Sequence, residues 1–293
     1  MTNRPHSRAT PAIHPAAHRA SVRALRAARA LAFAALALAT LGASPQPPDS
    51  SDALPEPLIV EGPGHEVLPA VAHPFLPGES LKFTVQYGMI HAGNAWLEVL
   101  PAREWQGRNV IGFRARAESN AFFSKFYKVR NVIESTWDRR GQFSCRYTED
   151  RREGGRRTHN DITFDHARHE ARYGDGTVVS IPPQVQDALS SFYYTRFQAL
   201  PIGGSVIFDY HNSKKSQPLR VKVLGRDKVS VPAGKFSCVV IEPELKAGGI
   251  FRNNGRLVIW LTDDERRMPV LMRSKVSVGS ISVVLTEWRR GGT

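Results

Sequence analysis

Hydrophobic and polar residues alternate in short runs along most of the chain after residue 79. Leu81, Phe83 and Val85, for example, alternate with polar positions, and the same period of two recurs up to about residue 290. Alternation of this kind is typical of β-strands with one buried and one solvated face. Short turns between consecutive runs favour an antiparallel meander. The pattern therefore predicts one mainly β domain over residues 79–290.

The first hairpin is predicted in the stretch LKFTVQYGMIHAGNAWLEV. Keeping the apolar residues of both flanks on the same side pairs Tyr87 with Leu97. This register leaves residues 91–93 as a three-residue loop, whose last residue, Gly93, is expected to take the left-handed conformation. His91 is then expected at an exposed turn, not at a catalytic centre.

One main helix is predicted near residues 184–200, in PPQVQDALSSFYYTRFQALP. Apolar side chains recur there at steps of three and four, as on one face of a helix. A shorter helix is indicated in NAFFSKFYKV. Because a sheet with one apolar face must close, pair or be covered, we expect a curved antiparallel sheet, a half-barrel or open barrel, packed on this main α-helix.

Residues 1–43 differ from the rest of the chain. They contain six arginines and no acid, and they end in an Ala/Leu-rich run of 14 residues. A positive start followed by a short apolar run describes a cleaved secretory signal, since a membrane-spanning helix needs about 20 residues. Residues 44–78 hold nine of the twenty prolines and are predicted to be a linker. The expected location is the periplasm.

The charge of the chain is smaller once the signal is set aside. Residues 44–293 keep 34 Lys and Arg against 27 Asp and Glu, a net charge of +7 instead of +13. Such a bias fits transient contact with an anionic membrane surface, or plain solvation of a secreted domain. RREGGRR lacks interleaved aromatic residues and is interpreted as a charged hairpin tip, so no nucleic acid partner is predicted.

Motifs with known chemistry are not found in the sequence. His166 and His169 lie between two strand runs, where they are expected to splay around a turn, so no metal site is predicted. TDDERRMP is interpreted as a polar turn whose acids are neutralised by its arginines. Cys145 and Cys238 are the only cysteines; neither lies near the signal, so a lipoprotein is not expected, and their pairing stays open. We predict no catalytic residues, no cofactor and no enzyme.

Aromatic clusters provide the candidate binding site. In a strongly curved, partly closed sheet these side chains would line a cavity for an apolar ligand. The candidates are Phe122, Phe126, Tyr127, Leu189, Phe192, Tyr193 and Phe197. The alternative is that they form an ordinary packed core.

Five stretches, in the same order along the chain, resemble a bacterial family called domain of unknown function 3108. They are LKFTVQYGMIHAGNAWLEV, FYKVRNVIESTWD, QDALSSFYYTR, VSVPAGKFSCVVIEP and IWLTDDERRMPV, between about Glu79 and Glu287. The resemblance implies an exported, β-rich protein of Gram-negative bacteria and no particular reaction. A looser, architectural likeness is to periplasmic half-barrel lipoprotein carriers that hold acyl chains, although fold alone does not grant function.

The leading hypothesis is a periplasmic protein that binds an apolar or amphiphilic envelope ligand, such as a lipid, between the sheet and the 184–200 helix. Basic residues at the rim would meet an anionic headgroup. Two alternatives stay open. One is a structural or protein-interaction module with a packed interior, and the other is a hydrolase of envelope polymers. The protein partners are not predicted.

Overall fold

The computed structural model describes residues 73–244, 256–275 and 279–292. The predicted signal and the linker up to residue 72 lie outside the described residues. The helices are α2 (Ala121–Ser124) and α3 (Ala188–Phe197). The strands are β1 (Ser80–Tyr87), β2 (Ile90–Val99), β3 (Arg103–Trp105), β4 (Arg108–Ser119), β5 (Val129–Asp138), β6 (Ser144–Glu153), β7 (Arg156–Asp165), β8 (Glu170–Tyr173), β9 (Val178–Ser180), β10 (Ser205–Asn212), β11 (Lys215–Val231), β12 (Gly234–Glu244), β13 (Leu257–Thr262), β14 (Pro269–Lys275) and β15 (Ser280–Arg289).

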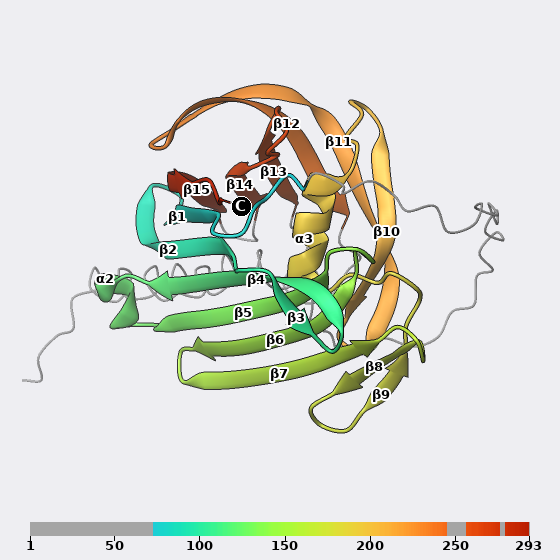
Figure 1. The fold of residues 1–293 in the computed structure, drawn as a ribbon. Coiled ribbons are helices and arrows are strands. Elements are labelled where there is room, and N and C mark those ends of the chain that lie inside the picture. Colours follow the sequence, from blue (N-terminus) through green and yellow to red (C-terminus); the bar gives the residue numbers. More distant parts are fainter. Residues whose placement is uncertain (1–72, 245–255, 276–278, 293) are drawn as a thin grey trace, which may run out of the picture.

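These strands form a single antiparallel sheet of 15 strands. The order is β10-β11-β12-β13-β14-β15-β1-β2-β4-β5-β6-β7-β8-β9, with β3 paired to β4. The sheet curves into a barrel-like wall with α3 inside it (Figure 1). The two ends of the order, β10 and β9, are not paired by a strand ladder. The prediction of a mainly β, curved antiparallel sheet packed on one main helix is confirmed.

The first hairpin is present, but its predicted register is wrong. Tyr87 pairs with Ile90 instead of Leu97, so the loop has only two residues, Gly88 and Met89. Gly88 has a φ of 59°, as expected for glycine at the first position of a two-residue hairpin loop. Beyond a bulge in β2, Leu97 pairs with Leu81 instead of Tyr87, so the two registers differ by six positions. Because this is an even number, both registers keep the apolar side chains inside. The alternation alone was therefore unable to choose between them.

Gly93 has a different role from the predicted one. It does not take a left-handed φ. It lies opposite Ser119 of β4, and a Cβ at this position would approach the carbonyl oxygen of Glu118 to 2.1 Å. A bulge next to Gly93 absorbs one extra residue, Ala92. Glycine is thus required by the close approach of β4 and not by the turn, while His91 is exposed as predicted.

Helix α3 is shorter than the predicted range of 184–200. Asp187 caps it, and the Asp187 carboxylate accepts a hydrogen bond from the backbone N–H of Ser190 at 2.8 Å. Gln186 cannot be helical, because its backbone makes two hydrogen bonds with β10. This short segment carries the chain from β9, alongside β10, to the start of α3. The buried residues of α3 lie on most of its sides and not on one face.

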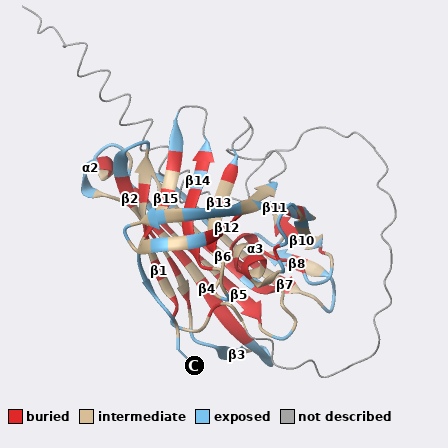
Figure 2. Ribbon diagram, turned by 90° about the horizontal axis from the view of Figure 1, so that it is seen from above, coloured by how far each residue is buried: buried red, intermediate tan, exposed pale blue. Residues whose placement is uncertain are grey.

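Aromatic side chains fill the interior around α3. The Tyr193 ring stacks on Phe113 with centroids 3.9 Å apart, and Phe75 packs edge-on against both rings at 5.2 Å. Trp137 completes the cluster, and all four side chains are fully buried. The buried stretches of the strands face this interior (Figure 2). Phe75 belongs to the stretch assigned to the linker by composition, so the folded part begins before residue 79.

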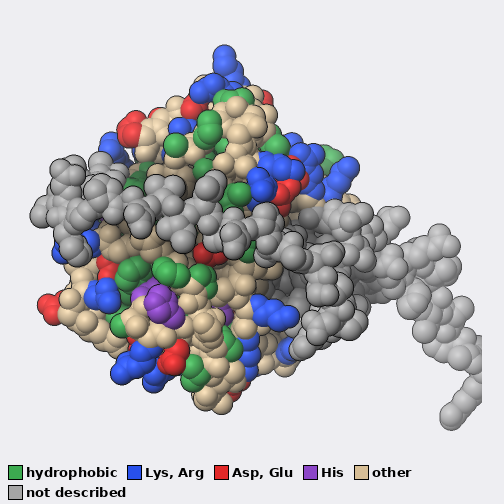
Figure 3. Space-filling view, turned by 90° about the vertical axis from the view of Figure 1, so that its right-hand side faces the viewer, with side chains coloured by type: hydrophobic (Ala, Val, Ile, Leu, Met, Phe, Trp, Pro, Cys, Tyr) green, Lys and Arg blue, Asp and Glu red, His purple; other side chains and the backbone are tan. Residues whose placement is uncertain are grey.

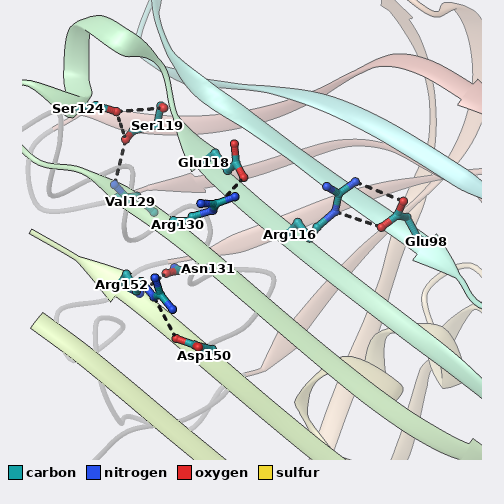
Figure 4. A network of polar contacts seen from close by, with 10 residues as sticks. All are labelled: Glu98, Arg116, Glu118, Ser119, Ser124, Val129, Arg130, Asn131, Asp150 and Arg152. Carbon is teal, nitrogen blue, oxygen red and sulfur yellow. Dashed lines mark hydrogen bonds and ion pairs between the residues drawn. The ribbon is translucent and has the colours of Figure 1, made fainter.

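The outer face of the wall is charged and paired. Arg116 of β4 donates two hydrogen bonds to Glu98 of β2, at 3.1 and 3.3 Å, and Arg130 lies 3.5 Å from Glu118 (Figure 4). On the side of β10, Lys and Arg gather in several separate groups rather than on one continuous surface (Figure 3). Exposed ion pairs contribute only about 0–1 kcal/mol each. These pairs place many of the charged residues on a solvated face.

Two polar turns predicted from the sequence are confirmed. RREGGRR forms the β6–β7 hairpin, whose turn residues Gly154 and Gly155 have φ values of 57° and 95°. The TDDERRMP stretch joins β13 to β14, and there the Arg266 side chain donates to Asp264 at 3.0 Å. Both turns use the chemistry that their composition indicates.

Candidate functional site

A cavity of about 1090 Å³ lies against β6 and β7. Its lining also includes the turn after β8 and the hairpin between β10 and β11. The lining changes in character along the strands. At one end Tyr147 pairs with Ile162, which pairs in turn with Tyr173. At the other end Glu153 pairs with Arg156, so the cavity runs from apolar to charged.

Glu149 lies between these two ends and is only 3% exposed. Its carboxylate is 2.9 Å from the Nε atom of Arg151 and accepts a hydrogen bond from the Asn160 amide at 2.6 Å. Burial raises the pKa of the Glu149 carboxyl, while Arg151 and Asn160 act in the opposite direction. The buried charge is therefore compensated by two partners, as buried charges usually are.

The charged end is held by an amide on β5. Asn131 is 2% exposed, donates a hydrogen bond to Glu153 at 2.7 Å and accepts one from the backbone N–H of Arg152 at 3.2 Å. Arg156 is exposed at the rim and forms no ion pair with another residue of the described part of the chain. Arg156 is thus the cation most available to a bound group.

Side chains close the barrel where its two ends meet. The Tyr173 hydroxyl is 2.6 Å from the Nε2 atom of His211 and accepts a hydrogen bond from the backbone N–H of Lys214 at 2.8 Å. The Lys214 ammonium donates to Asp175 and to Thr177, each at 2.7 Å. We call these five residues the seam. They join the β8–β9 turn to the β10–β11 hairpin beside the cavity.

The protonation states within the seam follow from burial. Burial lowers the pKa of His211 from 6.5 to about 4 and raises the pKa of Tyr173 to about 12. At neutral pH the imidazole is therefore uncharged and the phenol keeps its proton. Because the Tyr173 oxygen accepts from Lys214, its O–H is free to donate to the Nε2 atom of His211. The Nδ1–H of His211 then donates to the Ser216 hydroxyl at 2.8 Å.

The β10–β11 hairpin itself has an uncommon turn. Ser213 and Lys214 have φ values of 48° and 64°, whereas glycine or asparagine usually occupies such positions. Non-glycine residues in this region carry a conformational cost that surrounding contacts must offset. The three hydrogen bonds of Lys214 to the β8–β9 side supply those contacts.

The seven side chains predicted to line a cavity are placed elsewhere. None of them is among the residues that line the cavity described above. Two are buried in the core on α3, three are half-buried on α3 or beside the β6–β7 turn, and two are exposed, one on α2 and one just after it. In that order they are Leu189 and Tyr193; Phe192, Phe197 and Tyr127; and Phe122 and Phe126.

The interior charges were missed by reasoning from the sequence, although a signal for them exists. Tyr147 follows the alternating run of β6, and the same period of two leads directly to Glu149, Arg151 and Glu153. Charged residues are rarely buried without partners, so by its sequence this continuation indicates a solvated hairpin tip. The tertiary structure provides the partners on β5 and β7.

Other reactive side chains lie apart from the cavity. Within residues 73–244, 256–275 and 279–292 there is no group of three His, Cys, Asp or Glu arranged for a metal. His166 bonds instead to the carbonyl of Ser144 at 2.7 Å. Cys145 and Cys238 are separate buried thiols. No helix in the described part of the chain is long and apolar enough to cross a membrane.

One solved structure supports the fold. A β-barrel-like protein of the domain of unknown function DUF1849 from Brucella abortus is similar with a TM-score of 0.53 and 9% identity, over 74% of this chain and 99% of the other. A protein described as exported, with a YmcC-like fold, from Bacteroides fragilis gives 0.30 at 15% identity, over 75% and 100%. A protein described as a lipoprotein from Parabacteroides distasonis gives 0.35 at 10% identity, over 74% and 98%. The last two scores are low, and we draw no conclusion from them.

No curated protein matches the sequence at a significant level. The profile of one family does match, over residues 82–286, and its description is "Protein of unknown function (DUF3108)". The match covers almost the whole sheet, from β1 to β15, as the sequence motifs of the hairpins and of α3 indicated. The chain is therefore a member of the DUF3108 family.

Proposed function

We propose that the protein is exported and binds, without catalysing a reaction, an amphiphilic ligand of the cell envelope in the cavity along β6 and β7. The observation that carries this proposal is the change in lining from Tyr147 and Ile162 to Glu153 and Arg156. The cavity volume of about 1090 Å³ lies just above the usual range of small-molecule sites, roughly 300–1000 Å³.

The two ends of the cavity suit the two parts of an amphiphile. The apolar part would lie against Tyr147, Ile162 and Tyr173, where transfer from water is favourable at roughly 25 cal/mol per Å². The polar part would lie toward Arg151 and Arg156. Because planar guanidinium groups bind carboxylates and phosphates through paired hydrogen bonds, an anionic headgroup fits this end best.

The existing ion pairs also favour an anionic group. Glu149 is occupied by Arg151 and Asn160, Glu153 by Asn131, and Asp175 by Lys214. Glu149 and Asp175 are thus paired with cations and Glu153 accepts an amide hydrogen bond, whereas Arg156 has no ion pair within the described residues. A ligand anion at Arg156 would complete the pairing.

The place proposed for the ligand differs from the one expected from the sequence. The space between α3 and the sheet is filled by Phe75, Phe113, Trp137 and Tyr193, which leaves little room for an acyl chain there. This packed half supports the alternative of a structural or protein-interaction module. A structural or protein-interaction module would not need the cavity along β6 and β7, so the cavity favours ligand binding.

A hydrolase of envelope polymers is the second candidate, and one observation favours it. The buried carboxyl of Glu149 has a raised pKa, as general acids of glycosidases do. Such enzymes need a second carboxyl about 5–10 Å away. Glu153 is four residues further along an extended strand, a backbone separation of roughly 13 Å. Binding without turnover therefore fits the geometry better.

Export is supported by residues 1–43, with their arginines and their apolar run. Mass spectrometry of the intact protein from a periplasmic extract tests it. We expect a mature chain that begins near residue 44. A full-length chain that stays in the cytoplasm would contradict export.

A pair of matched variants tests ligand binding. Thr158 lines the cavity from β7, whereas Thr163 on the same strand does not. Thr158→Trp should fill the cavity and weaken binding of a fluorescent lysophospholipid or fatty acid at least about tenfold. Thr163→Trp should leave the affinity unchanged, and circular dichroism checks that both variants fold.

The proposal fails if the purified protein binds none of these probes and organic extracts of periplasmic protein contain no bound amphiphile. Equal effects of the two tryptophans would also contradict it. Turnover of ester, glycoside or amide substrates that is lost in Glu149→Gln would favour the hydrolase.

A further inference from the structure

Four large apolar side chains project into solvent at one end of the barrel. They are Met89, Ile90, Phe122 and Phe126, with exposures of 99%, 54%, 58% and 44%. We call these four residues the α2 tip. The β1–β2 turn and α2 lie together at this end, on the left in Figure 1 and again side by side in Figure 2.

Hydrogen bonds fix the two parts of the α2 tip to each other. Asn120 caps α2 through a hydrogen bond from the N–H of Phe123 to its side-chain oxygen, at 2.9 Å. The same side chain donates to the carbonyl of His91 at 2.8 Å, and the Asn120 N–H donates to the carbonyl of Ala92 at 3.0 Å. The helix is therefore docked on the start of β2, directly after Ile90.

The orientation of α2 keeps Phe122 and Phe126 exposed. Phe123 is 2% exposed and anchors the helix in the core. With Phe123 inside, Phe122 and Phe126 point outward, and their ring centroids are 5.5 Å apart. Single exposed apolar residues are ordinary on protein surfaces, but grouped ones indicate an interaction site. Met89 also occupies a two-residue turn, where polar residues and glycine are usual.

The charges around the α2 tip are positive. Lys125 and Lys128 are exposed and form no ion pair within the described residues. The Tyr127 ring packs directly on Gly154, since a Cβ added at Gly154 would lie only 2.1 Å from the ring. The β6–β7 turn with its arginines therefore packs beside α2. The first turn of α2 contains no acid. An apolar tip surrounded by cations complements an anionic lipid surface.

We infer that the α2 tip docks the protein reversibly on an anionic membrane surface. The four apolar side chains enter the interface between headgroups and acyl chains, and Lys125 and Lys128 contact lipid phosphates. The inference goes beyond ligand binding in the cavity and does not depend on it. It also places the charged end of the cavity, at Glu153 next to Gly154, beside the membrane.

Sedimentation with lipid vesicles tests this docking. The mature protein should bind vesicles of phosphatidylcholine mixed with phosphatidylglycerol, and should bind pure phosphatidylcholine more weakly. Phe122→Ser/Phe126→Ser should lower the partition coefficient about tenfold or more, since the variant removes two large apolar contacts. Lys125→Gln/Lys128→Gln should lower it about fivefold per cation, and the loss should shrink in high salt.

The control removes apolar side chains far from the α2 tip. Ile207 on β10 and Leu224 on β11 are 53% and 41% exposed, so Ile207→Ser/Leu224→Ser should bind vesicles as the parent does. A parent protein that does not bind anionic vesicles overturns the inference, as does an equal loss in the control. A dimer that dissociates when Phe122 and Phe126 are replaced, without vesicle binding, would show instead that the tip is a protein interface. Binding of the lysophospholipid probe is measured separately on Thr158→Trp, so failure of one proposal is distinguishable from failure of the other.

Discussion

Arg196 of α3 and Glu79, directly ahead of β1, form a buried ion pair with two hydrogen bonds of 2.7 and 2.8 Å. The Arg196 side chain is 0% exposed and also donates to the carbonyl of Arg266 at 3.0 Å. Its guanidinium lies 5.4 Å from the centroid of the Phe75 ring. One side chain thus connects the central helix with the start of the sheet and with the β13–β14 turn.

Replacing only one partner should destabilise the protein strongly. Arg196→Met leaves Glu79 buried without its cation, and we expect the free energy of unfolding to fall by about 3–5 kcal/mol. Urea unfolding followed by tryptophan fluorescence measures it. The double variant Glu79→Leu/Arg196→Met should recover part of the loss, because no charge is then left uncompensated. A loss below about 1 kcal/mol in Arg196→Met would contradict this role.

The Tyr173 hydroxyl should matter more to the seam than the Lys214 ammonium. Tyr173→Phe removes the partner of the buried Nε2 atom of His211, so we expect a loss of about 1–3 kcal/mol. Lys214→Ala removes a pair in which both side chains are more than one-third exposed, worth about 0–1 kcal/mol. Hydrogen exchange should quicken in β8 and β10 of Tyr173→Phe. Equal stabilities of the two variants would contradict this order.

The stability of the folded chain should depend on the pH through His211. Because folding lowers the pKa of His211 from 6.5 to about 4, the unfolded chain takes up a proton in this range while the folded chain does not. The stability that depends on a neutral His211 is therefore fully present above pH 6.5, and it is lost as the pH falls toward 4. The size expected is about 3 kcal/mol.

His211→Asn isolates this effect from the other histidines. Unfolding free energies measured between pH 7 and pH 4 should fall less steeply for the variant than for the parent protein. Parallel curves for the two proteins would show that His211 does not carry the dependence.

Two glycines of the first hairpin should respond differently to alanine. Gly93→Ala puts a Cβ 2.1 Å from the Glu118 carbonyl oxygen, so β2 and β4 must separate, and we expect a loss of about 3 kcal/mol. Gly88→Ala meets no atom within 4 Å and costs only the left-handed conformation, about 1–2 kcal/mol. Thermal unfolding of both variants measures the difference. In the predicted three-residue loop, by contrast, Gly93 would be the residue that needs a left-handed φ, and Gly93→Ala would cost only that conformation.

Both cysteines should be unreactive in the folded protein. Burial raises the pKa of the Cys145 thiol to about 12 and that of the Cys238 thiol to about 11, so the thiolate is scarce at pH 8. Titration with a thiol reagent should find no fast-reacting group in the native state and both thiols in denaturant without reductant. Finding no thiol in denaturant would reveal a disulfide.

The alternation of apolar and polar residues was enough to predict the strands, because the two faces of a strand are set by neighbouring positions. The cap of α3 and the charged turns were also local: the Asp187 carboxylate accepts from the N–H of Ser190, three residues on. Only the tertiary structure adds Ser135 of β5 as a further donor to this carboxylate. The packing of Leu189 and Tyr193 in the core agrees with the apolar periodicity of the helix. The aromatic residues Phe122 and Phe126 have the same character, yet they lie outside.

By itself the sequence determined the class of the fold, the order of its hairpins and the family. Only the tertiary structure decided the register of the first hairpin, since several registers keep the same side chains inside and the approach of β4 to Gly93 selects one. It also decided where the cavity lies, because Glu149 and Glu153 face the interior only where Asn160 of β7 and Asn131 of β5 bring them partners. Glu79 meets Arg196 across 117 positions of the chain, and a contact over such a separation is fixed by the curved sheet around α3 and not by any local pattern.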